Sequence, residues 1–100
     1  MADVCLTLLC SPALEEKLLD LLLMSPHPTL FTSAATAAHG LADGELSQTE
    51  QVLGRAFATQ VQVIFDESYR DALLEEIRRQ FAGARVHYWL VPVIEAGETT

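Results

Sequence analysis

Residues 54–83 read GRAFATQVQVIFDESYRDALLEEIRRQFAG, and the spacing of their apolar side chains changes part-way along. Every second side chain of residues 54–65 would share one face of a β-strand, and one such face carries Phe57, Thr59, Val61, Val63 and Phe65. In residues 66–83 the apolar side chains recur at helical spacing instead, at Leu73, Leu74, Ile77 and Phe81. The segment therefore predicts a strand that leads directly into an amphipathic helix.

The predicted helix carries its own end signals. Ser68 is a candidate N-cap, with Asp71 three residues later in a variant of the capping box. Glu75 can pair with Arg79 one turn further on, and Gly83 can close the C-terminal end. These signals support the helix over residues 66–83.

The flanking sequence predicts three more strands and a second helix. Residues 85–95, RVHYWLVPVIE, form the strand after the helix, and Pro92 within it indicates a bulge, a sheet edge or a departure from the sheet. Toward the N-terminus, residues 3–10 predict a strand, and residues 31–38 predict a weaker one of small side chains. Between these two strands a leucine-rich helix is predicted, with Ser11 as its N-cap.

The predicted order of elements is β-α-β-β-α-β, in one domain over residues 1–100. Right-handed crossovers turn this order into an α+β, ferredoxin-like sandwich, with a four-stranded antiparallel sheet and two helices on one face. The last strand then places Trp89, Val91 and Val93 on the face that the helices leave uncovered. An exposed apolar face predicts association, so we expect a homo-oligomer of cyclic symmetry packed through the sheets. The alternative is that Trp89 packs under the terminal tail.

The composition narrows the choice of partners. The chain has 14 acidic and six basic residues, and its formal net charge is −8. Non-specific nucleic-acid binding needs clustered lysine and arginine, so this charge argues against nucleic acid as a partner. The acidity would suit a basic partner surface or cations, or it would serve solubility.

The N-terminal sequence and the cysteines bear on the compartment. No apolar run reaches the length of a membrane span, and Asp3 stands where a signal peptide has a positive charge, so we expect no membrane insertion and a cytoplasmic protein. Cys5 and Cys10 are then expected to be reduced core thiols. Because they lie five residues apart on one strand, they point to opposite faces and are poorly placed to hold one metal together.

Motifs for catalysis are missing from the sequence. There is no Gly-x-Ser-x-Gly, no phosphate-binding Gly-rich run ending in Lys-Ser or Lys-Thr, no Cys-x-x-Cys and no His-Glu-x-x-His. Lys17, the only lysine, is expected to be a solvated surface charge. We therefore predict a protein that is not an enzyme.

Residues 38–54 are too many for a hairpin turn and too polar for a core, and long loops of this kind are usually functional or disordered. They contain the potential cation ligands His39, Asp43, Glu45 and Glu50. His39 would suit a divalent transition metal, and His87 in the last strand could be a ligand on the sheet surface. The alternatives are a flexible acidic loop without metal and a half-buried or interface histidine at position 87.

Three stretches carry a family resemblance: SAATAAHG before the long loop, TEQVLGRA after it, and VHYWLVPVIEAG at the end. Together they resemble a small bacterial family of unassigned function in the PII-like superfamily, to which PII nitrogen-signalling and CutA-type divalent-cation-tolerance proteins also belong. The resemblance implies a ferredoxin-like homotrimer whose sheets line the centre. It also implies that residues 38–54 are a "T-loop", the segment through which PII proteins contact transporters and enzymes.

The resemblance extends to single positions and to a role. Gly40 matches the glycine at the base of the T-loop, beside the cleft between subunits, and Arg55 lies at the opposite base, where it could face a phosphate or carboxylate. The chain lacks the GDGK-type segment that holds ATP phosphates in PII proteins, and its loop has no tyrosine, which argues against nucleotide binding and nitrogen signalling. The resemblance also implies a gene encoded beside heavy-metal efflux systems, and hence a regulator of metal homeostasis with a membrane transporter or efflux component as partner. The alternative is a CutA-like protein that binds divalent cations directly through His39 and His87.

Overall fold

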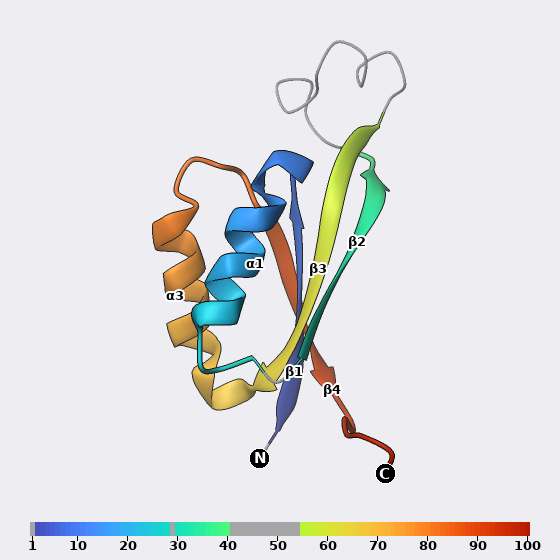
Figure 1. Ribbon diagram of the computed structural model, residues 1–100, viewed down its shortest axis with the longest axis vertical. Helices are drawn as coiled ribbons and strands as arrows, with labels where there is room; N and C mark the ends of the chain where they lie inside the picture. Colours follow the sequence, from blue (N-terminus) through green and yellow to red (C-terminus); the bar gives the residue numbers. More distant parts are fainter. Residues whose placement is uncertain (1, 29, 41–54) are drawn as a thin grey trace.

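Two central strands, β1 (Asp3–Cys10) and β3 (Ala56–Asp66), organise the sheet in the computed structural model, which describes residues 2–28, 30–40 and 55–100. β2 (Leu30–Ala38) pairs with β3, and β4 (His87–Val93) pairs with β1, all antiparallel. The helices α1 (Glu15–Met24) and α3 (Arg70–Gln80) lie side by side on one face of this sheet (Figure 1). The predicted ferredoxin-like β-α-β-β-α-β sandwich is therefore confirmed.

The strand register aligns the apolar side chains beneath the helices. Leu6 pairs with Val63 on one side and with Leu90 on the other, so all three project to the same face. The core formed there is completed by leucines of α1 and by the stripe Leu73, Leu74, Ile77 and Phe81 that the sequence predicted. Leu6, Val61 and Phe65 are fully buried, and burying each such side chain contributes about 1.5–3 kcal/mol.

The start of the second helix differs from the prediction. Asp66, not Ser68, is the cap residue: its Oδ1 accepts hydrogen bonds from the Ser68 amide at 2.9 Å and the Ser68 hydroxyl at 2.7 Å. These hydrogen bonds hold the pKa of the Asp66 carboxyl below its ordinary value. Asp66 keeps the extended backbone of a cap residue, and its ionised carboxylate is a stronger acceptor than a hydroxyl. Ser11 does occupy the cap position before α1, but its side chain makes no capping hydrogen bond.

One side-chain prediction on the helices is wrong and another, of an exposed Lys17, is incomplete. Arg79 forms its ion pair with Glu76, one turn back, and not with Glu75. Lys17 is not merely solvated, because its Nζ donates a hydrogen bond to the main-chain oxygen of Gln80 at 2.7 Å. The same ammonium lies 4.9 Å from the ring centre of Phe81, so it ties α1 to the end of α3.

Smaller predictions have mixed outcomes. Cys5 and Cys10 do point to opposite faces, but only Cys10 is buried, and Cys5 is half-buried on the face away from the helices. Pro92 lies in β4, which is an edge strand, so the edge reading is correct. Gly83 follows α3 with a φ of +80°, the left-handed conformation expected of a closing glycine. Among the described residues, no helix is long and apolar enough to cross a membrane.

Candidate functional site

The β2–β3 ladder ends at the pair Ala38 and Ala56. His39 and Gly40 follow on one strand and Arg55 precedes on the other, and all three are exposed. The structure therefore brings the three predicted ligand-binding residues to one end of the sheet. Gly40 has a φ of +79°, where a side chain is strained even though an added Cβ would meet no atom within 4 Å. That backbone requirement explains a glycine at this position.

Only some of the predicted metal ligands lie within the described residues. Asp43, Glu45 and Glu50 lie outside the described residues, and within residues 2–28, 30–40 and 55–100 no three His, Cys, Asp or Glu side chains group around a common point. His39 follows edge strand β2 and His87 begins the opposite edge strand β4. Two strands separate them, which is about 14 Å at the usual strand spacing. A metal held by both histidines would therefore have to form between chains, and their role as ligands stays a prediction.

A polar contact that the sequence did not predict lies just inside the loop base. The buried Thr59 hydroxyl donates a hydrogen bond to Oε1 of Glu15 at 3.0 Å, which ties β3 to the start of α1. Cys10 pairs with Thr59 across the strands, and burial, together with the nearby Glu15 carboxylate, raises the pKa of its thiol. Its surroundings therefore favour the protonated form of this core thiol. The only sign of this contact in the sequence is a polar residue, Thr59, on the otherwise apolar buried face of β3.

The face of the sheet away from the helices is the second feature. We call it the open sheet face, and its exposed or half-buried apolar members are Cys5, Leu9, Leu30, Ala34, Ile64, Trp89, Val91 and Val93. Leu30, Ile64, Cys5 and Val91 form one register row across all four strands. Trp89 and Val91 are each 46% exposed, so the terminal residues 94–100 do not bury Trp89. The predicted placement of Trp89, Val91 and Val93 is confirmed, and their role in an interface stays a prediction.

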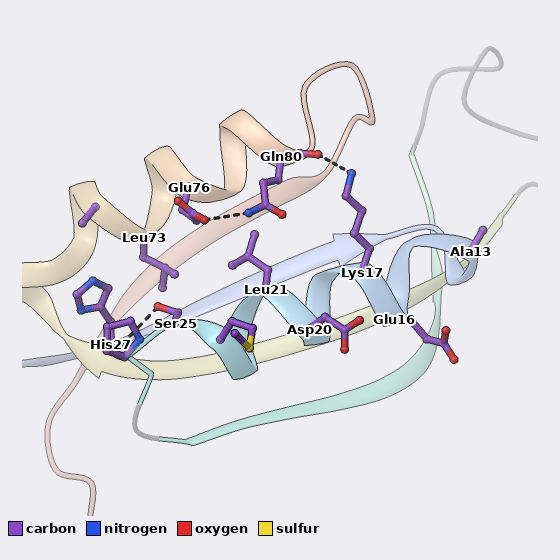
Figure 2. Close-up of a pocket in the computed structure, with 13 residues that line it drawn as sticks. Ala13, Glu16, Lys17, Asp20, Leu21, Ser25, His27, Leu73, Glu76 and Gln80 are labelled. Carbon is purple, nitrogen blue, oxygen red and sulfur yellow. Dashed lines mark hydrogen bonds between the residues drawn. The ribbon is translucent and has the colours of Figure 1, made fainter.

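A groove between α1 and α3 is the third feature (Figure 2). Its volume is about 770 Å³, and its lining includes Ala13, Glu16, Lys17, Asp20, Leu21, Met24, His27, Ala72, Leu73, Glu76 and Gln80. The bond from Lys17 to Gln80 crosses one end. At the other end the His27 ring stacks on Tyr69, with centroids 4.3 Å apart. The two rings of this stack are 42 residues apart in the chain, so the sequence alone gives no local sign of it.

The comparison with protein families shows which family the chain belongs to. Residues 1–100 match the family described as "Protein of unknown function (DUF3240)". The chain belongs to this family. A comparison of the DUF3240 chain with curated proteins finds no match.

Solved structures place the DUF3240 chain in the PII-like fold. A DUF3240 family protein from Shewanella baltica is 13% identical, with a TM-score of 0.83 over 100% of this chain and 99% of that one. CPII, a nitrogen regulatory PII-like protein from Thiomonas intermedia solved with ADP, AMP and bicarbonate, is 16% identical, with a TM-score of 0.72 over 100% and 98%. CutA1 from Oryza sativa is 9% identical, with a TM-score of 0.75 over 97% and 84%. The resemblance to a PII-like family of unassigned function is therefore confirmed, and at these identities the likeness concerns the fold.

Proposed function

We propose that this DUF3240 protein is a PII-like regulator that assembles as a homotrimer and binds a partner protein in response to a small ligand. The ligand site would lie between subunits at the loop base, with Arg55, Gly40 and His39 around it. The segment 41–54 would contact the partner, which we expect to be a transporter or efflux component in heavy-metal homeostasis. The observation that carries the proposal is the half-exposed apolar sheet face opposite the helices, on a PII-like fold.

The open sheet face supports assembly on physical grounds. Leu30, Trp89 and Val91 expose 59%, 46% and 46% of their surface, and they lie on one face with Cys5 and Ile64. Each Å² of apolar surface removed from water contributes about 25 cal/mol, so contact between such faces is favourable. A ring of three copies would bury every copy's face equally and leave none open.

The loop base supports a ligand of negative charge. Arg55 is the one cation that the described residues place beside the final ladder pair, and it is exposed. An arginine can bind a carboxylate or phosphate with two parallel hydrogen bonds. The chain lacks the GDGK-type segment for ATP phosphates, so we propose a small anion rather than ATP. CPII was solved with bicarbonate, AMP and ADP, which makes these three the first ligands to examine.

Isothermal titration of the purified protein with bicarbonate, AMP, ADP and ATP tests the ligand part of the proposal. We expect saturable binding of a small anion that Arg55→Ala abolishes. Arg70→Ala removes another exposed arginine, at the start of α3, and should leave binding unchanged. Binding of none of these anions to the intact assembly, or equal loss in both variants, would contradict the site.

Direct binding of divalent cations is the second candidate function, favoured by the similarity to CutA1 and by the exposed His39 at the loop base. Titration with Cu²⁺, Zn²⁺, Co²⁺ and Ni²⁺ separates the two functions. A double variant, His39→Ala with His87→Ala, should lose metal affinity if the histidines hold the ion. Unchanged affinity would eliminate this candidate and leave the regulator.

A further inference from the structure

Two alanines line the groove between α1 and α3. Ala13, just before α1, and Ala72, in α3, each contribute only a methyl group to its lining. Leu21 and Leu73 form its floor and are buried in the core beneath. The groove has a volume of about 770 Å³ and lies on the helix layer, on the side of the molecule away from the open sheet face.

The border of the groove along α1 ends in an exposed methionine. Met24, the last residue of α1, is 86% exposed and lines the groove beside the buried Leu21. Methionine side chains are flexible and polarisable, and they are frequent at surfaces that bind amphipathic helices. The groove thus offers apolar surface that no described residue covers.

The same border, along α1, is also acidic. Glu16 and Asp20 lie one turn apart on α1, and among the described residues neither carboxylate has a hydrogen-bond or ion-pair partner (Figure 2). Like charges at this spacing destabilise a helix. Glu16 has a local reason, the positive end of the helix dipole, but Asp20 lies beyond the first turn. Lys17, which could neutralise them, donates to Gln80 instead.

We propose that this groove is a docking site for a basic amphipathic helix of a partner protein. Two basic residues one turn apart on the partner would pair with Glu16 and Asp20, and apolar residues on its adjoining face would pack on Leu21 and Met24. The α1 helix has ten residues and is about 15 Å long, so it accommodates a helix of similar length. An amphipathic helix placed in a groove is a common mode of peptide recognition.

The negative charge of the chain favours a basic partner helix in the groove over a second copy of the chain or an anionic membrane. The chain has a formal net charge of −8, so a second acidic copy would be repelled from the rim, and so would a membrane of anionic lipids. The groove is lined by residues of α1 and α3, and these helices lie on one side of the sheet (Figure 1). The proposed trimer contact is on the other side of the sheet, so both surfaces can be occupied at once. The inference does not depend on the proposed trimer or on the ligand at the loop base.

The test is a titration of the ¹⁵N-labelled full chain with a synthetic 12-residue helical peptide that carries leucines on one face and lysines one turn apart on its flank. We expect saturable amide shifts at Glu16, Asp20, Met24 and Ala72. The double variant Glu16→Lys with Asp20→Lys should weaken binding roughly tenfold or more, because it replaces two attractive charge pairs with repulsive ones. Met24→Ser should weaken it roughly fivefold.

A matched pair controls for general charge attraction. Glu95→Lys with Glu98→Lys makes the same change in net charge on exposed residues after β4, and it should leave affinity unchanged. A peptide with glutamates in place of the lysines should not bind. If the lysine double variant fails to fold by circular dichroism, Glu16→Gln with Asp20→Asn removes both charges and should weaken binding severalfold.

Four results would overturn the proposal. They are no saturable shift at millimolar peptide, equal loss in the groove and control variants, shifts confined to the open sheet face, and a change in sedimentation of the peptide-free groove variant, which would assign the groove to a second copy.

Discussion

Lys17 of α1 donates a hydrogen bond from its Nζ to the main-chain oxygen of Gln80, the last residue of α3, across 2.7 Å. The final carbonyl oxygens of a helix lack partners within the helix, and a cation there interacts favourably with the helix dipole. Because Phe81 places its ring under the same ammonium, one side chain joins the ends of two elements that are distant in sequence.

Replacing this lysine should loosen the helix layer. We expect Lys17→Met to lower the free energy of unfolding by about 1 kcal/mol, because the apolar stem remains while the hydrogen bond to an orphan carbonyl is lost. Urea unfolding followed by circular dichroism measures this. Lys17→Arg, which keeps a donor and a charge, should recover part of the loss, and equal stability of Lys17→Met and wild type would contradict the contact.

The Asp66 cap should make the free energy of unfolding depend on pH. The pKa of Asp66 is lowered in the folded state by the hydrogen bonds from Ser68, so its contribution is complete above the ordinary aspartate pKa of about 3.9. That contribution is lost as the pH falls through the lower folded pKa. Urea unfolding at pH 7, 4 and 2.5 should show a smaller loss on acidification in Asp66→Asn than in wild type.

Ser68 offers a graded control for this prediction. Ser68→Ala removes the hydroxyl donor and keeps the amide donor, so its acid dependence should lie between those of the other two proteins. Identical pH profiles in all three proteins would mean that the carboxylate of Asp66 does not cap the helix.

The positive φ of Gly40 should make this position sensitive to any side chain. Gly40→Ala is expected to destabilise the protein by about 1 kcal/mol, since an L-residue in the left-handed region costs roughly that amount. Gly97 has no positive φ and no atom within 4 Å of an added Cβ, so Gly97→Ala should be neutral. Thermal unfolding of the two variants compares them, and equal melting temperatures would contradict the argument.

The two cysteines report on the open sheet face. Cys5 pairs with Val91 and is half-buried in a single chain, whereas Cys10 is in the core, where burial and Glu15 raise its thiol pKa. In a trimer packed through the open sheet face, Cys5 should react slowly with a thiol reagent at pH 8. In a Val91→Lys variant Cys5 should react quickly while Cys10 stays slow. Rapid labelling of Cys5 in the wild-type protein would contradict the interface.

Periodicity predicted the strands and helices of this fold because it depends on residues close together in the chain. The alternation around Val61 and Val63 and the helical spacing of Leu73 and Ile77 each identify an element and its buried face. The face of Trp89 followed in the same way, since successive residues of β4 point to opposite sides.

The predictions that were wrong or missing concern side-chain contacts, which neighbouring residues in the sequence do not determine. Asp66 and Ser68 are both acceptable cap residues by type, and only the backbone at Asp66 decides between them. The partner of Lys17 lies 63 residues away, so the sequence offers no local sign of it. The groove is lined by residues of two separate elements, and its volume depends on how those elements pack.

Sedimentation equilibrium of the wild-type protein beside Val91→Lys tests the proposed homotrimer held by the open sheet face. Leu23→Lys is the control, because Leu23 is 69% exposed on α1, away from that face. We predict that wild type and Leu23→Lys sediment at about three times the 11.0 kDa chain mass, and that Val91→Lys sediments as a monomer. A monomeric wild type, or a Val91→Lys variant that stays trimeric, would rule out a trimer held by the open sheet face.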